Sequence, residues 1–220
     1  RADGGEEALS FLMDQRIVPL HLADLYRQAA ERFGERPAFC TRQADGSFSA
    51  CSYRELYERG LCLATALIEL GLAPREHVGL MADNRLEWII CDCGILLAGA
   101  ADVPRGTDIT SGEVAYILEH ADVRFAMVEN AATLEKVHQQ RKALPRLEQV
   151  ILMDPAAEAP RGVLKLEDLI ARGRELRDAG DRRAEERIEQ IRPEDLFTII
   201  YTSGTTGTPK GVQLTHANMV

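Results

Sequence analysis

The first fifty residues alternate between a helical pattern and short β-prone pieces. Leu20 to Phe33 places apolar side chains every three or four positions, which predicts an amphipathic helix, and Gly34 follows as a stop signal. From Pro37 to Tyr53 the β-prone pieces flank Asp45-Gly46, a strong signal for a hairpin turn. The segment Ser52–Glu55 reads as a capping box, in which serine and glutamate side chains satisfy free amides at a helix start. The helix that it opens is expected to end at Gly71, a natural residue for a helix C-terminus.

After Gly71 short apolar runs alternate with longer helical patterns. The expected strands are 77–81, 100–104, 123–128 and 150–153, and the expected helices are 84–99, one from about Thr110 with Glu113 in a second capping box, and 133–144. Near-continuous apolar strands separated by helices are typical of a parallel sheet that is buried on both faces. The pattern therefore predicts an α/β fold: a mainly parallel sheet with helices on both faces.

Residues 154–192 interrupt this alternation. Pro155, Pro160 and Gly162 mark a loop, and Leu164–Ile170 is expected to be a short helical piece. The run ARGRELRDAGDRRAEERIEQI mixes both charges, and its two glycines weaken it as one helix. We interpret it as a solvated helical face or a surface insertion in preference to a binding patch.

The last apolar run, Leu196–Tyr201, leads directly into YTSGTTGTPKG, residues 201–211. A Walker A loop is excluded because Lys210 is preceded by Pro209 and followed by Gly211, and the dinucleotide fingerprint G-x-G-x-x-G is also absent. Val212 to Thr215 alternates apolar and polar residues, so the loop is expected to join two strands as a hairpin. Backbone amides exposed at glycines, hydroxyl groups and one lysine can together hold a phosphate.

Composition narrows the class of protein. The chain has 220 residues, 28% of them charged, and a formal net charge of −9, which gives no support to nucleic-acid binding. Five cysteines form no disulfide framework and favour a reducing cytosol. The longest apolar stretch, Trp88–Val103, is broken by two aspartates and is shorter than the roughly 20 residues that span a bilayer. We expect a piece of a longer chain, since residue 1 is Arg and residues 216–220 read as a helix barely begun.

Other conspicuous residues have ordinary interpretations. Cys91 and Cys93, two positions apart on a helix, are expected to be buried rather than metal-binding. His216 is expected in a turn or cap rather than as a catalytic base, and the other histidines in surface or packing roles. Trp88 fits a core helix better than a ligand shelf. Arg105 fits a strand-ending turn better than an anion contact.

The loop is also the point at which a family resemblance appears. The nine-residue core Thr202–Lys210 closely resembles the phosphate-binding signature of the adenylate-forming enzymes, which include acyl-CoA synthetases, luciferases and peptide-synthetase adenylation domains. Asn84–Asp108 resembles an early helix and strand of that family, and its DVPRGTD ending is most similar to bacterial long-chain acyl-CoA synthetases. The resemblance covers nearly the whole chain and is weakest over 154–192.

The resemblance implies a two-step ligase that uses ATP, Mg²⁺ and coenzyme A. A carboxylate attacks the α-phosphorus of ATP and releases pyrophosphate, and a thiol then attacks the acyl carbon and releases AMP. By resemblance, the loop wraps the β- and γ-phosphates, Lys210, Thr205 and Thr206 act in catalysis, and Thr205 reaches the metal, with Thr206 the next candidate. The full set implied to bind the nucleotide is Thr202, Ser203, Gly204, Thr205, Thr206, Gly207, Thr208, Pro209 and Lys210.

Residues 1–220 are therefore expected to be the N-terminal part of an AMP-binding domain that ends just after the phosphate loop. The acidic magnesium ligand, the adenine and ribose contacts and the C-terminal-domain lysine are all expected beyond Val220, so this piece alone should be inactive. The expected substrate is a long-chain fatty acid. The alternatives are a ligase for another carboxylate and a non-catalytic nucleotide- or acyl-binding relative. The expected location is the cytoplasm, with peripheral contact to the inner face of the membrane compatible with such a substrate.

Overall fold

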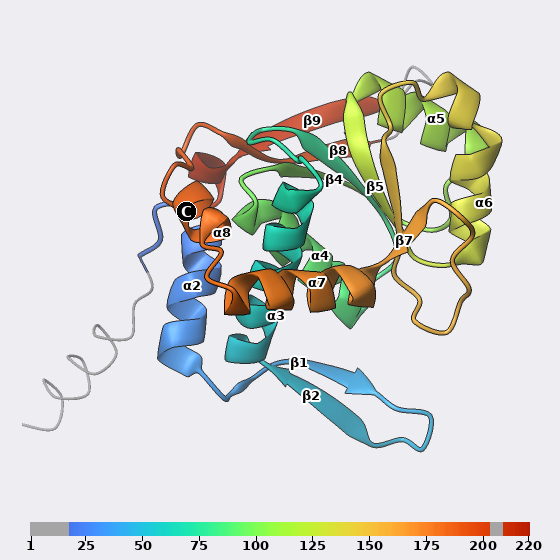
Figure 1. Ribbon diagram of the computed structural model, residues 1–220. Helices are drawn as coiled ribbons and strands as arrows, with labels where there is room; N and C mark the ends of the chain where they lie inside the picture. The colour runs from blue at the N-terminus through green and yellow to red at the C-terminus, as the bar shows by residue number, and fades with distance from the viewer. Residues whose placement is uncertain (1–17, 203–208) are drawn as a thin grey trace, which may run out of the picture.

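The computed structural model describes residues 18–202 and 209–220, and their secondary structure follows the predicted alternation closely (Figure 1). The strands are β1 (Pro37–Arg42), β2 (Phe48–Ser52), β3 (His77–Met81), β4 (Ala101–Arg105), β5 (Val123–Val128), β6 (Gln149–Leu152), β7 (Val163–Lys165), β8 (Leu196–Thr202) and β9 (Lys210–Thr215). The helices are α2 (Leu22–Phe33), α3 (Tyr53–Glu69), α4 (Leu86–Leu97), α5 (Ser111–His120), α6 (Ala131–Gln139), α7 (Leu166–Asp178) and α8 (Arg183–Ile188), with 3-10 turns η1 (Arg141–Ala143) and η2 (His216–Asn218).

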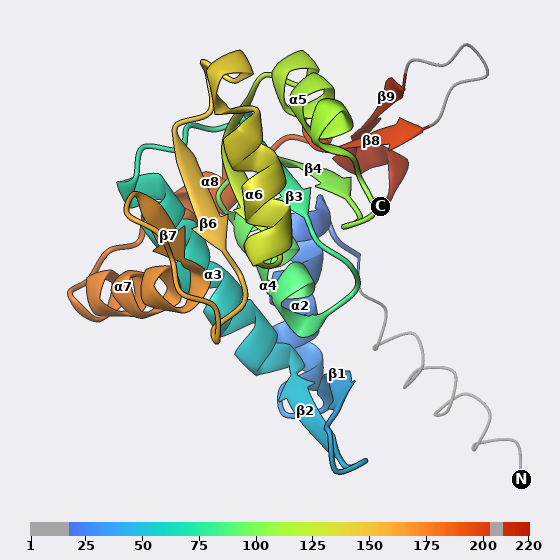
Figure 2. The ribbon, with the colours of Figure 1, turned by 90° about the vertical axis from the view of Figure 1, so that its right-hand side faces the viewer.

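Seven strands form one sheet in the order β7-β6-β5-β3-β4-β8-β9. Neighbouring strands run parallel except β8 and β9, which pair antiparallel at one edge. The predicted mainly parallel sheet is therefore confirmed. The predicted hairpin around Asp45-Gly46 forms a separate two-stranded sheet, β1-β2, which extends away from the rest of the molecule (Figure 2).

Helices cover both faces of the seven-stranded sheet (Figures 1 and 2). Side chains alternate across a strand, so successive residues enter different cores. Val78 and Leu80 of β3 pack with buried residues of α3, α4 and α7. Met81, the next residue, packs with buried residues of α5 and α6 on the opposite face. Burial on both faces explains why these strands read as continuous apolar runs.

Local capping signals predicted the starts of two helices, α3 and α5. Thr110 and Glu113 form the reciprocal capping box at α5. At α3 the Ser52 side chain accepts a hydrogen bond from the Glu55 amide, at 3.1 Å, so only this half of the expected box is present. Gly71 has a φ of 93° directly after α3, the conformation expected of a glycine that ends a helix. The helix predicted to run to Leu144 ends at Gln139, and a 3-10 turn follows it.

Of the two interpretations of the charged run 171–191, the solvated helical face is confirmed for the outer side of α7, and the surface insertion is wrong. The longer segment 154–192 contains β7, which adds a parallel strand to the sheet edge, and α7, whose inner face is buried. Gly173, expected to weaken the helix, lies where α7 crosses α3, and a Cβ there would overlap the carbonyl oxygen of Cys62. The glycine therefore permits a close helix approach, and only the outer face of α7 is the solvated charged face that the sequence indicated.

Candidate functional site

The predicted phosphate loop lies at the turn of an antiparallel hairpin. Thr202, at the end of β8, pairs with Lys210, at the start of β9, and Tyr201 pairs with Gly211. This confirms that the loop joins two strands and does not open a helix. Thr202 and Lys210 are exposed, and Pro209 is half-buried. Ser203, Gly204, Thr205, Thr206, Gly207 and Thr208 lie outside the described residues, so their predicted roles stay predictions.

Helix α5 packs against the base of this hairpin through three rings that we call the α5 aromatic cluster: Tyr116, His120 and Tyr201. The ring of Tyr116 stacks on that of His120 with centroids 5.3 Å apart, and Tyr201 stands edge-on to both. The hydroxyl of Tyr116 donates a hydrogen bond to the carbonyl oxygen of Pro209 at 3.0 Å. His120 Nδ1 and the hydroxyl of Tyr201 share a hydrogen bond of 2.6 Å. The cluster thus contacts the chain on both sides of the loop.

Tyr201 is buried at the base of the hairpin, and burial together with the nearby Tyr116 raises its pKa to about 12. A tyrosine hydroxyl is protonated at neutral pH even without this shift, so it can act as the donor to His120 Nδ1. Gly211 faces the same ring, and a Cβ at Gly211 would lie 3.1 Å from Tyr201 Cζ. The absence of a side chain there lets the two strands pair beside the aromatic ring.

A cavity of about 590 Å³ opens beside the hairpin, where β3 and β4 end. Its lining includes Asp83, Trp88, Arg105, Ile200 and Tyr201. In doubly wound sheets, ligands bind outside the carboxyl ends of the parallel strands. Arg105 ends β4, as the turn interpretation expects, and also lines this cavity. Trp88 packs against the core, as the sequence predicted, and it also lines this cavity.

The loops at this edge of the sheet are tied to one another. Asp83, which follows β3, accepts hydrogen bonds from the amide and hydroxyl of Thr107, at 2.9 and 2.6 Å. These bonds hold the pKa of Asp83 below its usual range. Glu129, which follows β5, accepts a hydrogen bond from the Asp83 amide at 2.8 Å. Three successive strand ends are therefore fixed relative to one another, which gives the cavity beside the hairpin a defined wall.

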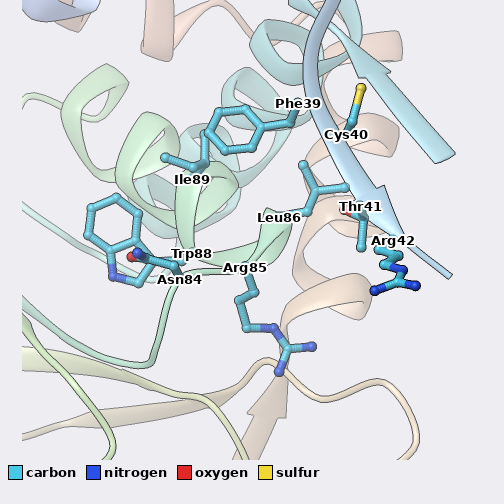
Figure 3. A pocket seen from close by; sticks show the side chains of 9 residues that line it. All are labelled: Phe39, Cys40, Thr41, Arg42, Asn84, Arg85, Leu86, Trp88 and Ile89. Carbon is cyan, nitrogen blue, oxygen red and sulfur yellow. The ribbon is translucent and has the colours of Figure 1, made fainter. Parts of the chain in front are cut away.

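A second cavity of about 500 Å³ lies between β1 and the start of α4 (Figure 3). The ring of Phe39 points toward Ile89, whereas Arg42 and Arg85 extend away from it (Figure 3). Arg85 is paired with Glu87 at 2.7 Å, and Glu129 lies 3.8 Å away. The charge of Arg85 is therefore largely balanced by neighbouring carboxylates.

Two aspartates interrupt the apolar stretch: Asp102 in β4 is buried, and Asp92 in α4 is half-buried. Asp92 of α4 accepts a hydrogen bond from the hydroxyl of Tyr26 at 2.6 Å. Asp102 of β4 pairs with Thr198 of β8, and among the described residues its Oδ1 has no hydrogen-bond partner. Burial, followed by the neighbouring charge of Asp92, raises the pKa of Asp102 to about 8, and burial raises that of Asp92 to about 6.

His216 lies in a terminal turn, and Cys91 and Cys93 are buried, as the sequence predicted. His216 is buried at the far end of the β8–β9 hairpin, in η2, and its Nδ1 accepts a hydrogen bond from the Leu22 amide at 3.2 Å. Burial lowers the pKa of His216 to about 4, so the ring is neutral and serves packing. Cys91 and Cys93 are buried free thiols whose pKa values are raised by burial, which makes them poor nucleophiles.

Within residues 18–202 and 209–220, no group of three or more His, Cys, Asp or Glu residues is placed to hold a metal ion. Thr205, the predicted metal contact, belongs to the part that the structure leaves undescribed. In the described part of the chain, the helices are too short or too polar to cross a bilayer.

The sequence did not reveal the α5 aromatic cluster. The sequence predicted only a surface or packing role for His120 and no role for Tyr116. Their spacing of four residues places both rings on one face of α5, which is the only available signal. The partners lie 81 and 93 residues further along the chain, beyond the reach of any local pattern.

Comparison with known proteins agrees with this geometry. The sequence profile described as AMP-binding enzyme matches residues 26–220. The long-chain-fatty-acid–CoA ligase ACSBG2 of Xenopus laevis is 30% identical over 204 residues, which are 92% of this chain and 27% of that protein. The long-chain-fatty-acid–[acyl-carrier-protein] ligase AEE15 of Arabidopsis thaliana is 31% identical over 206 residues, which are 90% of this chain and 28% of that protein.

The crystal structure of the anthranilate CoA ligase AuaEII with anthranoyl-AMP superposes with a TM-score of 0.76 and 26% identity, over 90% of this chain and 36% of that one. The chain therefore spans about a third or less of the two curated relatives' length.

Proposed function

The chain belongs to the AMP-binding enzyme family. From this premise we propose that the protein containing it activates a long-chain fatty acid with ATP and then transfers the acyl group to coenzyme A. The observation that carries the proposal is the Thr202–Lys210 signature at the turn of a hairpin beside the carboxyl ends of the parallel strands. We further propose that residues 1–220 form the N-terminal part of the AMP-binding domain, with the remaining parts of the site downstream.

The loop's proposed task follows from charge. When the carboxylate oxygen bonds to the α-phosphorus, the bond to pyrophosphate breaks and negative charge grows on the leaving group. Donors fixed around that group stabilise the transition state more than the bound ATP. Lys210 supplies a mobile positive charge suited to phosphate, and Thr205 and Thr206 supply hydroxyl groups. Mg²⁺, when bound with ATP, would neutralise phosphate charge, and Thr205 is the residue of this chain proposed to contact it.

The second half-reaction joins the acyl group to a thiol. The sulfur attacks the acyl carbon of the adenylate, AMP leaves, and a thioester forms. One similar protein is named as a coenzyme A ligase and another as an acyl-carrier-protein ligase, and a similar solved structure holds an aryl adenylate. A carrier-protein thiol and an aryl carboxylate are therefore the specific alternatives for acceptor and substrate.

A cytoplasmic location fits this proposal. All five cysteines are free thiols, which suits a reducing compartment. A long-chain substrate partitions into lipid, so peripheral contact with the inner face of the membrane belongs to the same proposal.

The proposal is tested with ATP–pyrophosphate exchange by the full-length protein across a panel of carboxylic acids. Exchange is expected with palmitate and weak with benzoate or acetate. Strongest exchange with benzoate or anthranilate would replace the fatty acid by an aryl substrate. Exchange with no acid of the panel would contradict the enzyme function and favour a non-catalytic nucleotide- or acyl-binding relative.

Lys210→Ala in the same protein tests the loop. We expect acyl-adenylate formation to slow by about 10²-fold or more, the usual cost of removing one transition-state donor. Lys142→Ala, on the exposed 3-10 turn after α6, removes a lysine outside the predicted site and is the matched control. Palmitate-driven exchange that is equal in the two variants would refute the assigned role of Lys210.

A further inference from the structure

The stem of the hairpin is held by side chains of α5, and this contact has a direct consequence for Lys210. The Pro209 carbonyl that accepts the Tyr116 hydroxyl belongs to the peptide unit that ends in the Lys210 nitrogen. That unit is planar, so fixing its oxygen also fixes the plane from which the Lys210 backbone starts. Lys210 is the first residue of β9, and its pairing with Thr202 is the final pair of the β8–β9 ladder before the loop. Without Tyr116, the strand ladder alone would orient it.

Helix α5 is a rigid support for this contact. Its N-terminus is closed by the capping box of Thr110 and Glu113. Its inner face buries Val114, Ile117 and Leu118 in the core against the sheet. The second bond of the α5 aromatic cluster, between His120 and Tyr201, fixes the other strand of the stem. Both strands of the hairpin stem are thus held by hydrogen bonds to one helix, α5, which lies outside the hairpin.

We propose that Tyr116 is a positioning residue for Lys210: its hydroxyl holds the Pro209–Lys210 peptide so that the lysine side chain is directed toward the phosphates. The proposal rests on the proposed function, because it assumes that Lys210 acts on the leaving pyrophosphate. Tyr116 acts through Lys210 and makes no contact with substrate of its own. The hydroxyl is the essential group, and the ring serves packing with His120.

The test is Tyr116→Phe in the full-length protein, which removes the hydroxyl and keeps the ring. One neutral hydrogen bond corresponds to a loss of about 3- to 10-fold. We expect acyl-adenylate formation in a single turnover at saturating ATP to slow by that factor, with the KM for palmitate unchanged. Tyr53→Phe, at the start of α3, is the control and should retain the parent rate.

A double-mutant cycle separates positioning from a general structural role. In a Lys210→Ala background, Tyr116→Phe should cause no further loss, because its effect passes through the missing lysine. Independent losses that multiply would overturn the proposal while leaving the function of Lys210 intact. An unaltered rate in Tyr116→Phe would overturn it as well. A Lys210→Ala variant with the parent rate would instead remove the loop role on which the proposal rests.

Hydrogen–deuterium exchange gives a readout that does not depend on activity. In Tyr116→Phe the amides of Lys210 and Gly211 should exchange faster, while peptides from α5 keep the parent protection. Faster exchange throughout α5 would mean that the helix itself is loosened, and this result would contradict a local positioning role. Parent protection at Lys210 and Gly211 would contradict it too.

Discussion

At the scale of single residues, Asp102 shows how a buried carboxyl group affects stability. Its side chain is 2% exposed, and its Oδ1 lacks a partner within the described structure. An ionised carboxylate in that position would be very unfavourable, so the folded protein holds the proton to higher pH. Asp92 is shifted in the same direction by burial.

The sign of the resulting pH dependence is fixed. The pKa of Asp102 is raised from its ordinary value of 3.8 to about 8 on folding. Between these values the folded state binds more protons than the unfolded state, so this residue makes the free energy of unfolding fall as pH rises from about 4 to 8. Asp102→Asn removes the titration of this residue and leaves that of Asp92. We expect the variant to gain stability over the parent at pH 8 and much less at pH 5, measured by urea denaturation. Parallel stability curves for the two proteins would refute the assignment.

The residues of the α5 aromatic cluster could not be predicted from the sequence, whereas Lys210 could. The loop signature indicated Lys210 because nine consecutive residues carry it. Tyr116 and His120 act through partners on another element, and only the folded chain brings them together. A local pattern therefore reveals residues that touch a ligand more readily than residues that hold them in place.

At the scale of elements, the crossing of α3 and α7 depends on one glycine. A methyl group at Gly173 would overlap the backbone of Cys62, and backbone cannot move aside as a side chain can. We expect Gly173→Ala to lower the free energy of unfolding by about 3 kcal/mol or more, the upper part of the range for overpacked cores. Urea denaturation measures the change.

Gly112→Ala is the matched control for this prediction. Gly112 also lies in a helix, α5, but a Cβ there meets nothing within 4 Å. The higher helix propensity of alanine should make this variant as stable as the parent or more so, by up to about 1 kcal/mol. Equal effects of the two substitutions would show that Gly173 matters only through helix propensity.

Most elements could be predicted from the sequence, and the errors have a common cause. The parallel strands were visible because burial on both faces makes them uniformly apolar. Helix α7 carries charges on its outer face and Gly173 on its inner face, so the sequence left a solvated helical face and a surface insertion equally open for the charged run 171–191. Gly173 is required because α7 packs closely against Cys62 of α3, a residue more than a hundred positions earlier in the chain. Strand β7 was missed because it has three half-buried residues and no long apolar run.

At the scale of the whole molecule, we propose that the chain supplies one wall of a larger site. The hairpin that carries the loop stands at one edge of the sheet, where β9 pairs with β8. Ile200 and Val212 remain 39% and 44% exposed on these two strands. The matched region makes up 27% and 28% of the length of the two similar curated proteins.

A final prediction follows for a polypeptide of these 220 residues alone. Supplied with palmitate, ATP, Mg²⁺ and coenzyme A, it should release no AMP, whereas the full-length protein should. The loop's donors are proposed to act on the leaving pyrophosphate, and the residues that the family resemblance assigns to the adenine, the ribose and the second half-reaction are expected outside these 220. Adenylation needs the carboxylate aligned with the α-phosphorus, and phosphate contacts alone do not provide that alignment. Palmitate-dependent AMP formation by the purified polypeptide, absent from its Lys210→Ala variant, would show that this chain holds a complete site.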